Sequence, residues 1–328
     1  MCYTTENDTI IFSPNFNGNL DIKLISGYTK LIFSNYALFD THNLHYIGSY
    51  FNQKVNTLPQ NLTHLTFGND FNQEVNALPQ NLTHLTFSYK FNQKVNTLPQ
   101  NLTHLTFGVS FNQEVNTLPQ NLTHLTFGND FNQEVDNLPH NLTHLTFGNK
   151  FNQKVNALPQ NLTQLTFGYR FNQEVNYLPQ NITHLTFGLN FNKKVNNLPQ
   201  NLTHLIFGYC FDQNIDMFPN ITYLKLNCNN QCIINNLPNS IEELEIECDF
   251  NLELNNLPTS IKKIIFHKNN RYSIELNCLP NFVKFLQLPE NYDKKILQLP
   301  IGLKTIKCSK HYKFLSDFSN RNVQYYDQ

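Results

Sequence analysis

Residues 61–80 read NLTHLTFGNDFNQEVNALPQ, and this unit recurs with few changes every twenty residues from residue 51 to residue 210. A fixed period near twenty is typical of solenoid proteins, in which each unit is one coil that contacts mainly its two neighbours. One coil buries too few side chains to be stable alone, so the coils have to stack. The repeat therefore predicts a single elongated solenoid, although 328 residues would ordinarily suggest two domains.

Each unit combines a strand signal with a segment that cannot join a sheet. With Leu62 as position 1, apolar residues at positions 4 and 6 alternate with polar residues at positions 3 and 5. This period of two is typical of a strand with one buried face. Gly68, at position 7, ends the strand, and Pro79, at position 18, has no N–H to donate to a ladder. We therefore expect one short strand and one return arc in every coil.

The same spacing continues in degenerate form on both sides of the regular block. Position 1 of the later coils is predicted at Ile221, Ile241, Ile261, Val283 and Leu303. Upstream, YTKLIF at 28–33 has the shape of LTHLTF, and FNGNL at 16–20 has that of FNQKV. We expect residues 1–50 to be an N-terminal cap with a degenerate repeat, 51–210 eight regular repeats, 211–308 degenerate repeats of the same solenoid, and 309–328 a C-terminal cap or tail. The fold class is a β-rich solenoid of about 14 coils of about 20 residues.

Two polar columns bear on how the coils stack. Position 13 is Lys or Glu in every regular coil, and six of the seven neighbouring pairs have opposite sign, as in-register stacking favours: Lys54, Glu74, Lys94, Glu114, Glu134, Lys154, Glu174 and Lys194. Asparagine recurs at position 11, as at Asn72, and mostly at position 15, as at Asn76. These amides either form ladders from coil to coil or simply suit the turns, and the sequence leaves both interpretations open.

Composition and charge narrow the class of partner. The chain is 40% hydrophobic and 14% charged with a formal net charge of −1, so there is no electrostatic reason to expect nucleic acid or a membrane surface as partner. The start, MCYTTENDTIIFSP, lacks the basic and apolar regions of a signal peptide, and no apolar run reaches the ~18 residues of a membrane span. We therefore expect a cytoplasmic protein, and we interpret its seven cysteines as free thiols.

The repeat resembles two known patterns. LxxLxF followed by LPxxL is similar to a short leucine-rich repeat, and FGNDFNQEVNALPQNLTHLTF at 67–87 resembles the FNIP repeat family of social amoebae and of giant viruses that infect amoebae. The resemblance implies a right-handed solenoid with one parallel sheet, a role in protein interaction, and, for a viral chain, the host cytoplasm. Many FNIP proteins begin with an F-box, but residues 1–50 show no leucine-rich helical pattern. A ubiquitin-ligase adaptor role is therefore not expected.

The sequence predicts an interaction protein and no enzyme. It contains no GxSxG, HExxH or phosphate-binding glycine loop, so we expect neither catalysis nor a cofactor. The outward positions 3 and 5 are almost uniform, whereas positions 8 and 9, just after the strand, change from coil to coil. A surface that discriminates a partner needs such variation, and tyrosine and arginine are favoured anchors. The predicted contacts to a partner protein are Tyr89, Lys90, Tyr169, Arg170 and Tyr209.

Histidine recurs at position 3, which supports a second hypothesis. The column comprises His64, His84, His104, His124, His144, His184 and His204, and Gln164 interrupts it. Imidazoles about 4.8 Å apart can share a metal ion, although zinc prefers three or four converging ligands, and no metal site is assigned here. A purely structural solenoid is a third possibility. Stacked imidazoles repel one another when charged, so we expect their pKa values to be lowered by folding.

Overall fold

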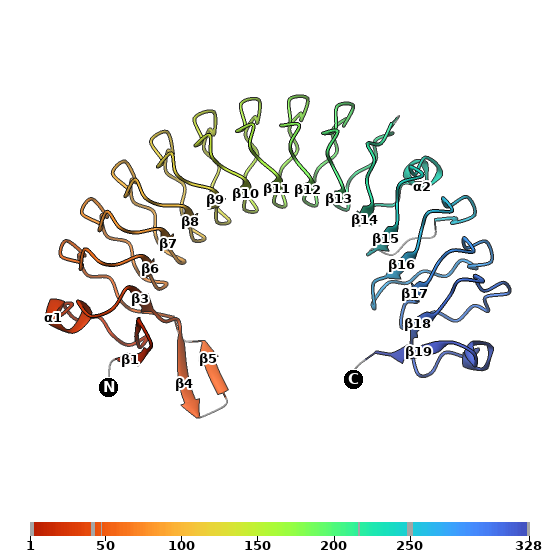
Figure 1. The fold of residues 1–328 in the computed structure, drawn as a ribbon, viewed down its shortest axis with the longest axis horizontal. Coiled ribbons are helices and arrows are strands. Elements are labelled where there is room, and N and C mark those ends of the chain that lie inside the picture. The colour runs from red at the N-terminus through yellow and green to blue at the C-terminus, as the bar shows by residue number, and fades with distance from the viewer. Residues whose placement is uncertain (1–2, 41–42, 47, 216, 248–251, 327–328) are drawn as a thin grey trace. The chain divides into compact units, whose positions relative to one another are not determined.

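The computed structural model describes residues 3–40, 43–46, 48–215, 217–247 and 252–326. It divides into two compact units, Met1–Tyr169 and Arg170–Gln328. Each unit is a stack of coils of about twenty residues, and in each the strands lie side by side (Figure 1). The predicted solenoid architecture is therefore confirmed within both units.

The first unit consists of one parallel sheet with an antiparallel strand at its start. Neighbouring strands pair residue for residue, so that His64 is opposite His84 and Leu65 is opposite Leu85. β1 pairs with β2 in the antiparallel sense. The strands of this sheet are β1 (Tyr3–Glu6), β2 (Thr9–Phe12), β3 (Lys30–Phe33), β6 (His64–Thr66), β7 (His84–Thr86), β8 (His104–Thr106), β9 (His124–Thr126), β10 (His144–Thr146) and β11 (Gln164–Thr166). A separate hairpin joins β4 (Tyr36–Asp40) to β5 (Asn43–Tyr46), and α1 (Ile22–Ile25) is a single helical turn.

The second unit repeats this arrangement with parallel strands alone. Its strands are β12 (His184–Thr186), β13 (His204–Phe207), β14 (Tyr223–Leu226), β15 (Glu243–Ile246), β16 (Lys263–Phe266), β17 (Phe285–Gln287), β18 (Thr305–Cys308) and β19 (Asn322–Tyr325). One return arc contains the short helix α2 (Gln231–Asn235), whose first turn is capped by the Asn230 side chain. The 3-10 turn η1 (Leu315–Phe318) precedes β19.

All fourteen predicted strand positions carry a strand, and two more parallel strands were missed. β2 pairs with β3, and Phe16 stacks between Phe12 and Phe51, so residues 9–20 form an additional coil. β19 lies in the range predicted as a cap or tail. The proline of position 18 precedes neither strand, so the repeat spacing did not predict them. The β4–β5 hairpin was also not predicted.

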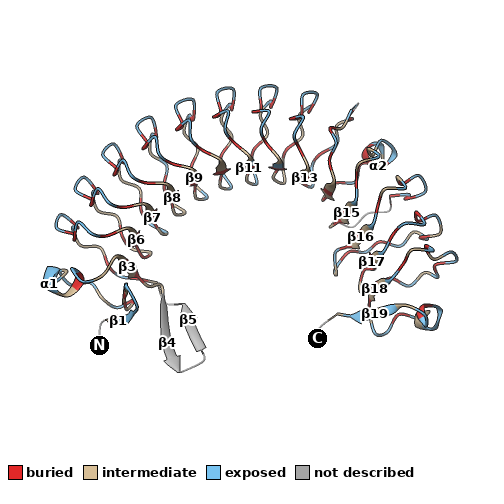
Figure 2. Cartoon of the chain, viewed as in Figure 1, coloured by how far each residue is buried: buried red, intermediate tan, exposed pale blue. Residues whose placement is uncertain are grey.

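A column of phenylalanines forms the core of the first unit. Position 6 and position 10 of one coil stack face to face, as in Phe127 and Phe131, whose ring centroids are 3.8 Å apart. Phe131 also stacks on Phe111 and Phe151 of the neighbouring coils, each at 6.1 Å. Figure 2 shows the buried residues inside the coils of both units and the exposed residues at the tips of the arcs. The side chains are therefore divided between the core and the surface as the alternation of apolar and polar residues predicted.

Glycine at position 7 allows the coils to approach one another closely. A Cβ added to Gly128 would lie 1.9 Å from the carbonyl oxygen of Gly108 in the preceding coil. No side chain fits at that distance, so position 7 requires glycine where this contact is made. Ser88 is the exception in the regular block, and its hydroxyl hydrogen-bonds Asn69 in the preceding coil at 2.5 Å.

The amide column at position 11 is a ladder, which decides one of the alternatives left open above. The Asn92 Oδ1 atom accepts a hydrogen bond from the backbone N–H of Asn112 at 2.9 Å and another from Gln113 Nε2 at 3.0 Å. The same bond recurs between most neighbouring coils of the regular block. At position 15 no such ladder forms among the described residues, since Asn76 contacts Glu74 and Thr97 instead.

Candidate functional site

The histidines of position 3 form a stacked column on the sheet face of the first unit. The ring centroids of successive imidazoles from His64 to His144 are 4.1–4.2 Å apart, and their planes differ by 10–13°. In the second unit His184 stacks on His204 at 4.1 Å. The in-register pairing of strands imposes this geometry, because it places identical residues directly opposite each other.

The threonine before each histidine fixes the position of the ring proton. Thr123 Oγ1 donates its single hydrogen to the carbonyl oxygen of Thr103 at 3.1 Å, and it lies 2.9 Å from His124 Nδ1. A hydroxyl has one hydrogen, so Nδ1 must be the donor in the second contact. The neutral ring therefore carries its proton on Nδ1 and a lone pair on Nε2. The same pair of contacts recurs at His64, His84, His104, His144 and His204.

The folded protein holds the pKa of five histidines of the column below the ordinary value of 6.5. Partial burial is the main cause at His84, and repulsion by His64 and His124 adds to it. The pKa values of His64, His104, His124 and His204 are lowered in the same way, again with burial as the larger cause. The expected direction is therefore confirmed for these five residues, although burial outweighs the predicted repulsion.

The same stacking works against chelation of a metal ion by the column. Lone pairs lie in the ring planes, and rings that are nearly parallel direct their lone pairs along parallel lines. Two neighbouring Nε2 atoms would have to rotate toward each other, which would break the Nδ1 contacts to threonine. Within the described part of the chain, no three His, Cys, Asp or Glu side chains are placed to hold one ion.

The predicted partner contacts lie on exposed turns after the strands, in two separate units. Tyr89 is 51% exposed and Tyr169 48% exposed in the first unit, and Tyr209 is 65% exposed in the second. Lys90, next to Tyr89, forms an ion pair with Asp70 of the preceding coil at 2.8 Å. This hydrogen bond to Asp70 raises the pKa of Lys90. Arg170 is exposed as well. The structure thus presents all five side chains to solvent, three in one unit and two in the other.

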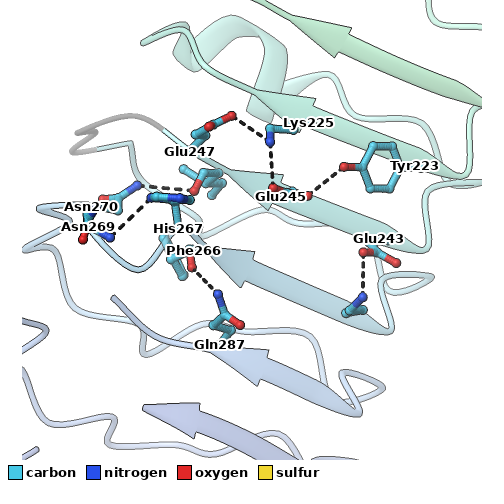
Figure 3. Close-up of polar contacts among 12 residues, drawn as sticks. Tyr223, Lys225, Glu243, Glu245, Glu247, Phe266, His267, Asn269, Asn270 and Gln287 are labelled. Atoms are coloured by element: carbon cyan, nitrogen blue, oxygen red, sulfur yellow. Dashed lines mark hydrogen bonds and ion pairs between the residues drawn. The ribbon is translucent and has the colours of Figure 1, made fainter. Parts of the chain in front are cut away.

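A cluster of charged side chains lies on β14–β16 (Figure 3). Lys225 bridges Glu245 at 2.9 Å and Glu247 at 2.7 Å, and the Tyr223 hydroxyl donates to Glu245 at 2.7 Å. Glu243 pairs with Lys263 of the next coil at 2.8 Å. In-register pairing places Glu245 opposite Lys225 on one side and Ile265 on the other.

The protonation of this cluster follows from its contacts. Burial by itself lowers the pKa of Lys225, but the hydrogen bonds to Glu247 and Glu245 outweigh it and raise the pKa. Burial alone would raise the pKa of Glu247, and the hydrogen bond from Lys225 leaves it lowered. Burial and the bond to Glu245 raise the pKa of Tyr223. At neutral pH Lys225 is therefore an ammonium group, and it lies between Glu245 and Glu247.

The charged residues of position 13 and the cysteines, which the sequence also singled out, lie outside these clusters. The alternating charges of position 13 line shallow polar hollows on the arcs, such as the one between Lys54 and Glu74, and no ion pair joins them among the described residues. Cys228 and Cys308 are buried free thiols, and burial raises their pKa values to about 12 and about 11. Cys248 lies outside the described residues.

The comparisons with known proteins agree with this geometry. The family model described as FNIP Repeat matches ten segments, of which the first nine overlap, at residues 51–90, 74–110, 91–130, 114–150, 131–169, 151–190, 174–210, 191–227, 211–249 and 250–291. Among curated proteins, none has a sequence that matches this chain significantly.

Two solved structures resemble the chain. One is CroV588, a giant-virus protein described as a novel circular LRR protein, with 40% sequence identity and a TM-score of 0.73. The match covers 92% of this chain and 50% of CroV588, so the chain spans half the length of that relative. The other is YopM from Yersinia enterocolitica WA-314, with 16% identity, a TM-score of 0.54, and coverage of 96% of this chain and 72% of that one. The YopM likeness extends to the fold alone.

Within the described residues, none of the helices has the length and apolar character needed to cross a bilayer.

Proposed function

Because the chain belongs to the FNIP repeat family, we propose that it is a non-enzymatic interaction protein whose sheet face binds a partner protein. The leucine-rich-repeat-like solenoid supports this proposal, since such folds present an extended array of side chains at fixed spacing. In the Thr–His pairs the hydroxyl gives its hydrogen to a backbone carbonyl and Nδ1 is the donor, so the imidazole does not act as a base toward the hydroxyl. Lys225, Glu245 and Glu247 are paired with one another.

The observation that carries the proposal is the contrast between constant and variable positions on one face. Positions 3 and 5 of the regular coils repeat His and Thr, whereas the exposed turn that follows changes from Asn69 to Tyr89 to Val109 in three successive coils. Large, exposed aromatic residues are frequent anchors in protein interfaces, and an adjacent cation adds selectivity. We therefore place the contacts at Tyr89, Lys90, Tyr169, Arg170 and Tyr209.

The ion pair of Lys90 fits this role. Both Lys90 and Asp70 are accessible to solvent, and exposed pairs of this kind contribute little to stability. A carboxylate of the partner can therefore replace Asp70 without disturbing the coil. Lys150 and Asp130, three coils further on, form an equivalent pair at 2.9 Å but without a neighbouring tyrosine. That pair provides an internal control for the contribution of the aromatic ring.

We assign the remaining parts of the chain to support of this face. Residues 1–50 and 309–328 act as caps, 51–210 supply the regular coils, and 211–308 continue the solenoid with individual outward side chains. A cap hides the core face of the last coil, which would otherwise expose apolar side chains to water.

The test is affinity capture from the cytosol of the relevant amoebal host with two matched variants. The face variant carries Lys90→Glu, Arg170→Glu and alanine at Tyr89, Tyr169 and Tyr209. The arc variant carries Lys94→Glu, Lys154→Glu and Tyr177→Ala, which make the same charge change on the return arcs. Loss of the captured protein with the face variant and its retention with the arc variant are expected. Equal capture by the wild type and the face variant would refute the placement.

A further inference from the structure

The last coils of the second unit carry a concentration of positive charge that the chain total conceals. Residues 251–328 contain twelve Lys and Arg against six Asp and Glu, a formal charge of +6 in a chain whose net charge is −1. Several of these lysines are neutralised locally, for example Lys294 by Asp293 and Lys295 by Asp317. The cations without such a local ion pair are therefore the ones that are available to bind a partner.

Four of these cations occupy one column at position 2, immediately before the strands. Lys262, Lys284, Lys304 and Arg321 precede β16, β17, β18 and β19 at the blue end of the chain (Figure 1). Backbone hydrogen bonds join them, from Lys284 N to the Lys262 oxygen at 2.7 Å and from Lys304 N to the Lys284 oxygen at 2.9 Å. Like charges on directly neighbouring strands destabilise a sheet, so this column is maintained at a cost to the free protein.

Within the described part of the chain, the first member of the column alone has a counterion. Lys262 pairs with Glu242, whereas Lys284, Lys304 and Arg321 form no ion pair with any of the described residues. In all eight regular coils position 2 is threonine, such as Thr103. The cations are therefore specific to this end of the solenoid.

Two exposed apolar side chains lie beside the column. Phe282 is 66% exposed and Ile301 is 80% exposed, on the turns that enter β17 and β18. These turns are adjacent, because Gly302 N donates to the Asn281 oxygen at 2.8 Å. The regular coils carry polar residues, mostly Gln followed by Asn, at these positions. Exposure of two large apolar groups next to unpaired cations is typical of an interaction surface.

We infer that this basic-apolar stripe, defined as Lys262, Lys284, Lys304, Arg321, Phe282 and Ile301, binds an acidic segment of a protein that also carries apolar side chains. The inference rests on the proposed function and names a second contact surface for it. Charge complementarity selects an acidic partner, because three neighbouring cations have no counterion among the described residues. The apolar residues select a protein over nucleic acid, since phosphates and sugars offer Ile301 no apolar complement.

The probe is a fluorescently labelled synthetic helix with Glu on one face and Leu on the other, and its binding is measured by anisotropy. Two further peptides serve as controls, one with Lys in place of Glu and one with Ser in place of Leu. We expect the Glu-Leu peptide alone to bind, and we expect the affinity to weaken as salt is added. No binding, or equal binding of the Lys-Leu peptide, would overturn the inference.

Matched variants locate the site on the protein. Lys284→Glu with Lys304→Glu is expected to weaken binding of the Glu-Leu peptide by about tenfold or more, and Phe282→Ser with Ile301→Ser by a similar factor. Lys310→Glu with Lys313→Glu makes the same charge change at exposed lysines outside the stripe and should alter the affinity by less than about twofold. If both stripe variants bind like the wild type, the inference is wrong.

The wild type and the lysine variant also test two other possible ligands of the stripe. Vesicles containing phosphatidylserine and a DNA duplex are offered to the wild type and to the lysine variant at physiological salt. Lysine-dependent binding to either of them, without binding of the Glu-Leu peptide, would replace the proposed occupant. The capture experiment that tests the proposed function uses the face variant, which leaves the stripe unchanged. A failure of peptide binding to the stripe therefore does not refute the proposed function.

Discussion

Thr123 Oγ1 lies 2.9 Å from His124 Nδ1 while its hydrogen is donated to the Thr103 carbonyl. The repetition of this relationship along the column leaves each neutral ring with its lone pair on Nε2. Protonation therefore takes place on Nε2 and keeps the threonine contact intact. What changes on acidification is the charge on rings stacked 4.1–4.2 Å apart.

Stability is expected to fall as the pH is lowered. The pKa values of His84, His104 and His124 are below 6.5 in the folded state, so the unfolded chain binds more protons in that range. The contribution of the column is complete above about pH 7 and declines as the pH falls through about 6.5. Melting temperatures measured from pH 8 to pH 5 should decrease.

Substitution separates this effect from the general response to acid. The triple variant His84→Gln, His104→Gln and His124→Gln uses the residue that the protein itself has at Gln164. It should flatten the pH dependence, whereas His140→Gln on an arc should not. A wild-type profile that is flat, or one that the triple variant leaves unaltered, would argue against the stacked column.

Zinc is not expected to bind the column at micromolar concentration. The parallel lone pairs do not converge, and rotating the rings would forfeit the contacts to threonine. Isothermal titration at pH 7.5 should show no saturable heat. A stoichiometric transition that disappears in the triple glutamine variant would establish a metal site and contradict this interpretation.

Position 7 is expected to tolerate no side chain where two glycines of neighbouring coils face each other, as at Gly128 and Gly108. Gly128→Ala would bring a Cβ to 1.9 Å from the Gly108 oxygen, and it should lower the free energy of unfolding by about 2–4 kcal/mol because the coils must separate. Gly27→Ala, with no atom within 4 Å of the added Cβ, is the control and should be nearly neutral. Urea denaturation measures both. Equal stability of the two variants would disprove the close approach.

The amide ladder should contribute measurably to stability. Asn92→Ala removes the acceptor of two hydrogen bonds from the next coil and should cost about 1–3 kcal/mol, since the Asn112 N–H loses its partner. Asn96→Ala, at an exposed arc position of the same coil, should change the stability by less than about 0.5 kcal/mol. Similar losses for both would mean that the amides merely suit the turns.

The regular coils were predictable because period, alternation and turn residues all agree. Leucine at position 4, glycine at position 7 and proline at position 18 each constrain the backbone independently, and the observed strands begin and end within a residue or two of the predicted positions. The degenerate coils kept enough of the pattern to be found. Even where the phenylalanine of position 10 is replaced, Tyr272, Tyr292 and Tyr312 retain the stack, and their hydroxyls donate to backbone oxygens of the preceding coil.

Other features of the structure depend on contacts between coils, which the spacing of residues in the sequence does not predict. Strand β2 is recognisable as part of the sheet only through its pairing with β3, and β1 only through its pairing with β2. The partnership of Lys225 with Glu245 and Glu247 required the exact register of β14 on β15. The basic column could not be predicted from the sequence, because β19 had not been predicted and its pairing with β18 is what places Arg321 in register with Lys304.

The most direct test of the central claim is hydroxyl-radical footprinting of the protein with and without its captured partner. Tyr89, Tyr169 and Tyr209 lie on the turns after the strands, whereas Tyr177, which is 68% exposed, lies on a return arc. All four should be oxidised readily in the free protein. We predict that the partner protects the first three and leaves Tyr177 unchanged. Protection of Tyr177 alone, with undiminished oxidation of the other three, would contradict an interaction through the sheet face.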